Sequence, residues 1–287
     1  MRIMKKTLFF VMVALIAASC EKVVLSDEGI STKMVKNVNM RVNGDFGSPT
    51  FTRSLMADGK EMTDLWVFDY VDGELVQTIH QTDDDSDFGE PNILMEYGEH
   101  KLYFVASRGL NPDVDDVEHT ITWSNVRDTF WKTITINVNS TSANEVDVTL
   151  ERVVTKLKLN IQDKVPTGLV NITITPEEWN FGIDYITGEP ASVGDTPISI
   201  FVPSSYVGTT GNLSVSIFSL SGASEWTTNV TVTAKNGSNG TISSVNIDNV
   251  PLMTNRATVY SGTLFKYGIT FTLSLTDVWL NEKILTW

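Results

Sequence analysis

Four closely spaced acidic residues are the first candidates for chemistry in this sequence. Asp83, Asp85, Asp87 and Glu90 could supply carboxylate oxygens, which are the ligands that Ca²⁺ prefers. A helix–loop–helix calcium site needs Gly directly after the third ligand, but Phe88 stands at that position. The run therefore favours a self-repelling hairpin loop, with a calcium site as the alternative.

The other reactive side chains form no recognisable catalytic set. The sequence lacks HExxH, GxSxG, GxGxxG and phosphate-loop motifs. His80, His100 and His119 have no Cys or Ser partner at a known spacing, so we expect three solvated histidines. Adjacent carboxylates such as Glu177 and Glu178 would point to opposite faces of a strand, which does not suit acid–base chemistry at one bond. The sequence predicts no enzyme, cofactor or metal, and a hydrolase is a distant alternative.

The seven tryptophans suggest an alternative function, glycan binding at the surface. Trp66 lies in an apolar run and is expected in a core. Trp179 and Trp226 lie in polar segments that resemble loops, so they are the better candidates for an exposed sugar platform. Because aromatic residues of β-sandwiches are mostly core residues, the platform stays an alternative.

The first twenty residues have the layout of an export signal. A basic start at Arg2, Lys5 and Lys6 precedes an apolar run over residues 7–18, which is too short to cross a bilayer. Small residues then lead to Cys20, the one Cys of the chain. This arrangement resembles a bacterial lipobox, although Ala17 replaces the usual Leu. It predicts a lipoprotein signal peptide over residues 1–19, a diacylated Cys20 and a polar tether over residues 20–33.

The net charge narrows the range of partners. The chain has 35 acidic and 21 basic side chains, a formal charge of −14. Such a surface repels phosphate backbones, so we expect no nucleic-acid partner. It would not adhere to anionic lipid either, so the sequence assigns membrane attachment to acyl chains on Cys20.

Past the tether, apolar and polar residues alternate with the period of β-strands. The predicted strands cover residues 38–42, 65–70, 74–80, 101–106, 133–138, 146–150, 157–161, 170–174, 198–202, 213–217, 230–233, 241–247, 258–265, 270–275 and 283–287. Asp72-Gly73 predicts a tight hairpin turn. A single segment, residues 124–131, looks helical, with Ser124 or Asn125 as its cap.

Short alternating runs separated by turns predict an all-β fold of antiparallel sandwiches. The best domain boundary lies near Glu151-Arg152, between two sets of strands. We therefore predict an N-terminal domain over residues 34–152 and a C-terminal domain over residues 153–287.

Several segments together resemble a known family. They are residues 52–54 (TRS), 64–70 (DLWVFDY), 103–106 (YFVA), 150–157 (LERVVTKL), 251–258 (PLMTNRAT) and 262–265 (GTLF). Behind a lipobox, this order resembles the fimbrillin superfamily of type V pili, and is most similar to the lipoprotein anchor or minor subunits of the FimB type.

The resemblance implies two tandem transthyretin-like β-sandwich domains, export, and assembly into a fimbrium at the outer membrane. It implies partners that are other fimbrial subunits, joined by β-strand addition. In stalk subunits of this superfamily an Arg-specific protease removes the N-terminal strand, whereas anchor subunits keep it. Residues 38–42 match that strand, Arg53 follows it and Arg41 lies within it. Cleavage at Arg53 would indicate a stalk subunit, and an intact chain would indicate an anchor.

Overall fold

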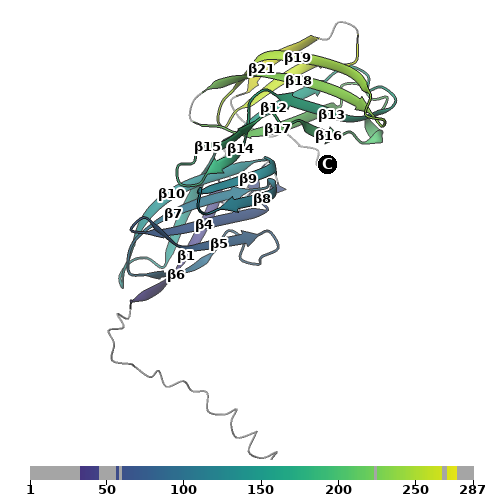
Figure 1. Cartoon of the computed structure of the whole chain (residues 1–287). Helices are drawn as coiled ribbons and strands as arrows, with labels where there is room; N and C mark the ends of the chain where they lie inside the picture. Colours follow the sequence, from purple (N-terminus) through teal and green to yellow (C-terminus); the bar gives the residue numbers. More distant parts are fainter. Residues whose placement is uncertain (1–32, 45–55, 58–59, 223–224, 267–269, 277–287) are drawn as a thin grey trace, which may run out of the picture. The chain divides into compact units, whose positions relative to one another are not determined.

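The protein is built almost entirely from β-strands. The computed structural model describes residues 33–44, 56–57, 60–222, 225–266 and 270–276 (Figure 1). Within these ranges the one helical element is a 3₁₀ turn, Ser204–Tyr206. The predicted all-β sandwich architecture is confirmed, and the transthyretin-like topology stays a prediction. The described strands belong to one compact unit, Val35–Trp287.

The first half of the chain forms a seven-stranded sheet. Its order is β5 (Glu74–Thr82), β4 (Asp64–Val71), β7 (Gly98–Ser107), β10 (Thr129–Val138), β11 (Glu145–Arg152), β1 (Val35–Gly44) and β6 (Asn92–Glu96). Buried side chains from β1, β4, β6, β7, β10 and β11 share one core cluster, so the sheet curls around its own core. Its two edges approach each other, because Gln77 Nε2 on β5 donates to the Leu94 carbonyl on β6 at 3.2 Å.

Strand β1 is held on both sides. It pairs parallel with β11 and antiparallel with β6. Val38, Met40 and Val42 point into the core while their neighbours Asn39 and Arg41 are exposed, which is the alternation read from the sequence.

The Asp72-Gly73 turn forms as predicted between β4 and β5. Asp72 has φ 52° and Gly73 has φ 86°, so both adopt left-handed conformations. Two-residue hairpins with positive φ at both positions match the twist of the strands, and Gly adopts that conformation without strain.

The second half of the chain contains two four-stranded sheets that share a core. One has the order β17 (Leu213–Leu220), β12 (Val154–Ile161), β20 (Ala257–Thr263) and β21 (Thr270–Thr276). The other has the order β16 (Ile198–Phe201), β13 (Leu169–Pro176), β18 (Trp226–Asn236) and β19 (Thr241–Leu252). Leu159 and Val215 of the first sheet and Ile172 and Val232 of the second belong to one buried cluster.

A third four-stranded sheet contains strands from both sides of residue 152. Its order is β15 (Pro190–Gly194), β14 (Trp179–Asp184), β9 (Thr120–Asn125) and β8 (Leu110–Asp115), and β14 pairs with β9 through Gly182 and Thr122. In Figure 1 the green strands β14 and β15 lie beside the teal strands β8 and β9. The boundary near Glu151-Arg152 stays a prediction. The sequence patterns missed all four strands.

The predicted helix over residues 124–131 is wrong. Ser124 and Asn125 end β9, and Thr129 begins β10. Phe130 is fully buried and pairs with Ala106 of β7, so long-range pairing prevails over the local helical pattern. A small antiparallel pair of β2 (Met56–Ala57) and β3 (Lys60–Glu61) completes the described strands. The predicted strand at 283–287 lies outside the described residues.

Candidate functional site

The candidate site is a cavity of about 330 Å³ beside the sheet of β15, β14, β9 and β8. Its lining comes from three places in the chain, which are the end of β9, the start of β14, and the link between β15 and β16 (Figure 1). The lining residues are Trp123, Ser124, Asn125, Val126, Trp179, Phe181, Gly194, Thr196, Pro197, Ile198 and Ser199. Its volume falls within the range of about 300–1,000 Å³ that is usual for small-molecule sites.

Aromatic and apolar side chains form the inner surface of this cavity. Trp123, Val126 and Trp179 are buried, and Phe181 and Ile198 are half-buried. Gly109 lies so close to the Trp123 indole that a Cβ there would come within 2.4 Å of Cδ1. The absence of a side chain at position 109 therefore lets the indole occupy this place.

A hydrogen bond fixes the indole of Trp179 but not that of Trp123. Trp179 Nε1 donates to the Phe218 carbonyl at 2.8 Å. Trp123 Nε1 is buried, and no hydrogen-bond partner for it occurs in the described part of the chain. Packing alone, including an edge contact with Trp66 at 6.4 Å between ring centroids, holds the Trp123 ring.

The rim of the cavity is polar and uncharged. Ser124, Thr196 and Ser199 are exposed and Asn125 is half-buried. Ser124 Oγ donates to the Leu110 carbonyl at 3.0 Å and accepts from Asn111, so its bonds are internal. No side-chain hydrogen bond joins Asn125, Thr196 or Ser199 to any other described residue. Those three side chains are free to bind a ligand.

The alternative of a surface tryptophan platform gains no support from the positions of Trp179 and Trp226. Trp179 is 4% exposed and begins β14, and the half-buried Trp226 begins β18, so neither lies in a loop. Their ring centroids lie 6.1 Å apart with planes tilted by 59°, which leaves no shared flat face. Trp66 is buried in the core, as expected. The aromatic residues of the cavity that the sequence patterns did not single out are Trp123, which directly precedes the predicted helix, and Phe181.

The prediction of three solvated histidines is wrong for His100. Its side chain is 2% exposed, with Nδ1 2.7 Å from Asp69 Oδ1 and Nε2 2.9 Å from the Glu96 carbonyl. Asp69 is fully buried and also accepts from Gln77 Nε2 at 2.8 Å. This buried polar group lies inside the first sheet and away from the cavity-lining residues.

The other two histidines also have partners. His80 is 41% exposed, stacks on Trp66 at 4.7 Å and lies 2.8 Å from Asp64. His119 Nδ1 lies 3.2 Å from the Tyr70 hydroxyl and 3.3 Å from the Tyr185 hydroxyl. Burial raises the pKa of both tyrosines, and the hydrogen bond from Tyr70 adds to the effect on Tyr185. These two tyrosines therefore stay neutral in ordinary buffers, and they do not point to catalysis.

The acidic run at residues 83–90 is a turn. The Asp85 carboxylate accepts from the Thr82 backbone N–H at 2.7 Å and from its hydroxyl at 3.2 Å. No group of three or more potential ligands that could hold a metal ion occurs among the described residues. The calcium alternative therefore gains no geometric support.

Of the three residues assigned to anchoring or cleavage, Arg41 is the one that the structure describes. Cys20 and Arg53 lie outside the described residues. Arg41 lies in β1 and forms an exposed ion pair with Asp147, with Nε 2.7 Å from Oδ1. Its hydrogen bond to Asp147 raises the pKa of the Arg41 guanidinium. Over the described ranges, none of the elements is a helix long and apolar enough to cross a membrane.

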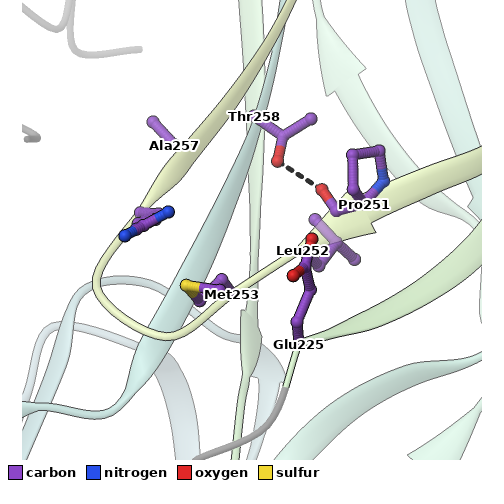
Figure 2. A pocket seen from close by; sticks show the side chains of 7 residues that line it. Glu225, Pro251, Leu252, Met253, Ala257 and Thr258 are labelled. Carbon is purple, nitrogen blue, oxygen red and sulfur yellow. Dashed lines mark hydrogen bonds between the residues drawn. The ribbon is translucent and has the colours of Figure 1, made fainter. Parts of the chain in front are cut away.

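A second, smaller cavity is too small for a ligand. Figure 2 shows it at the turn between β19 and β20, next to Glu225, with the Thr258 hydroxyl donating to the Pro251 carbonyl. Its volume of about 20 Å³ has room for about one water molecule.

Comparisons with known proteins find solved structures of similar fold. No family model matches the chain, and no curated protein matches it. A candidate adhesin from Bacteroides ovatus is 11% identical, with 84% of this chain and 95% of that chain covered and a TM-score of 0.50. A candidate polysaccharide-binding protein from Bacteroides thetaiotaomicron is 10% identical, with 79% and 92% covered and a TM-score of 0.50.

The tip fimbrial protein Mfa3 from Porphyromonas gingivalis, truncated at its C-terminus, is also a neighbour. It is 15% identical, with 84% of this chain and 100% of that chain covered and a TM-score of 0.45. At such low identities a likeness shows the fold alone. The two neighbours with a TM-score of 0.50 therefore support the predicted all-β fold.

Proposed function

We propose that the chain is a structural lipoprotein subunit of a fimbrium, and that it anchors or assembles the fibre at the outer membrane. Acyl chains on Cys20 would hold it to the membrane, and the protein would act by docking and without catalysis. The fold shared with a candidate adhesin and the lipobox-like N-terminus support this role.

One observation carries the anchor role. Strand β1 contains residues 38–42, which the resemblance matches to the strand that stalk subunits lose, and it is paired on both sides by β11 and β6. Its buried side chains Val38, Met40 and Val42 belong to the first core, so removing them would open that core to water. The arrangement suits a subunit that keeps its N-terminal strand. It also disfavours cleavage at Arg41, because a protease needs an extended, unpaired substrate.

Strand addition needs an open sheet edge, and two described edges differ in this respect. β8 is an edge strand whose residues are all exposed, but Pro112, Asp113 and Asp115 interrupt it. Proline and charge discourage edge-to-edge pairing. β21 is the edge of its own sheet and contains no charged residue or proline over Thr270–Thr276. We therefore propose β21 as the edge that receives a strand from a neighbouring subunit.

A Cys20→Ala strain tests the anchoring role. We expect the variant protein to leave the outer-membrane fraction, because stable attachment depends on the acyl chains. We also expect fibres that are shed or altered in length when cells are examined by electron microscopy. A Ser19→Ala strain is the matched control and should behave as the wild type. Unchanged membrane association and unchanged fibres in the Cys20→Ala strain would contradict the proposal.

A further inference from the structure

We propose that the cavity beside the sheet of β15, β14, β9 and β8 binds one neutral sugar ring. This ligand class goes beyond the structural role proposed above, and the binding does not depend on assembly of a fibre. The inference rests on three properties of the cavity, which are its volume, the pairing of aromatic with polar lining residues, and the absence of charge.

The lining matches the two kinds of surface on a sugar ring. A pyranose has faces of C–H groups and a rim of hydroxyl groups. Phe181 and Ile198, which are half-buried, line the cavity together with the buried Trp123 and Trp179 and offer apolar contact to such a face. Sites of this composition, apolar with a few polar groups at fixed positions, are typical for small ligands.

Free hydrogen-bonding groups surround this apolar surface. The Asn125 amide can both donate and accept, and the hydroxyls of Thr196 and Ser199 can do the same. None of these three side chains forms a hydrogen bond to another described residue. Hydroxyl groups of a sugar need partners that donate and accept in this way, so the rim complements the edge of a pyranose ring.

The charge of the lining selects among small ligands. No acidic or basic side chain occurs among the described residues that line the cavity, although the whole chain has a formal charge of −14. An anionic sugar such as a sialic acid would enter without a cationic partner and against the net charge of the protein. A neutral hexose or N-acetylhexosamine would pay no such penalty.

Titration of the purified full-length chain in detergent tests the inference. The probes are the methyl glycosides of glucose, galactose, mannose and N-acetylglucosamine, followed by tryptophan fluorescence and by calorimetry. We expect saturable binding of at least one of them, and no binding of sialic acid or glucuronic acid. Asn125→Ala and Thr196→Ala should each weaken that binding about tenfold, because each removes a hydrogen bond to the ligand.

Two matched variants are the controls. Asn92→Ala and Thr78→Ala remove the same side chains from exposed positions on β6 and β5, and they should leave the binding constant unchanged. Three results would overturn the inference. They are no saturable binding of any neutral glycoside, binding that the Asn125 and Thr196 variants leave unchanged, and a response to an apolar dye such as anilinonaphthalene sulfonate alone.

Discussion

Replacing Arg152 by Ala should lower the free energy of unfolding by about 3–5 kcal/mol. Arg152 Nε and Nη2 donate to the two carboxylate oxygens of Asp128 at 2.7 and 2.9 Å, and both side chains are almost fully buried. Arg152 Nη1 also donates to Asn255 at 3.0 Å, and its guanidinium lies 4.8 Å from the centre of the Phe130 ring. The truncation would leave a buried carboxylate unpaired, which is the costly part of breaking such a pair.

Urea denaturation of the full chain, followed by tryptophan fluorescence, measures this loss. The matched control is Arg41→Ala, because Arg41 makes a similar bond to Asp147 but both side chains are more than half exposed. The Arg41→Ala variant should lose much less free energy of unfolding, because solvent screens exposed ion pairs. The double variant Arg152→Met with Asp128→Leu should recover most of the stability. Equal losses in the Arg152 and Arg41 variants would contradict the account of the buried pair.

The second large effect is expected for His100→Ala, which should also lower the free energy of unfolding by about 3–5 kcal/mol. The variant would remove the imidazole that contacts Asp69, a fully buried carboxylate on β4, and would leave a void beside it. Gln77 Nε2 would remain as a donor to Asp69, but it cannot replace the imidazole contact.

His80→Ala is the control for this prediction. His80 lies 2.8 Å from Asp64, much as His100 lies near Asp69, but its side chain is 41% exposed. The same denaturation measurement should therefore show a smaller loss for His80→Ala, part of it from the stacking on Trp66. A His100 variant as stable as the wild type would show that the buried pair does not hold the sheet together.

Local signals in the sequence are sufficient to predict much of the fold. The Asp72-Gly73 turn was predictable because two residues with positive φ join adjacent strands, which is a property of the dipeptide itself. Strand β1 was predictable because the apolar Val38, Met40 and Val42 alternate with polar residues. One face of the strand is buried and the other is exposed.

The sheet of β15, β14, β9 and β8 could not be predicted in the same way. Its strands β9 and β14 come from different halves of the chain, and their pairing at Gly182 and Thr122 has no short-range signature. The burial of Trp179 and His100 is likewise set by distant segments. Trp179 bonds to Phe218, and His100 bonds to Asp69, so neither residue reveals its surroundings through its immediate neighbours. The cavity depends on the same long-range pairing and was missed with it.

The mass of the N-terminal peptide of the native protein, taken from the outer-membrane fraction, tests the central claim most directly. The account predicts a chain that begins at Cys20 with fatty acyl groups attached and that continues uncut through Arg41 and Arg53. A terminus at Ser54, or an unmodified Cys20, would contradict a lipid-anchored subunit that keeps its first strand.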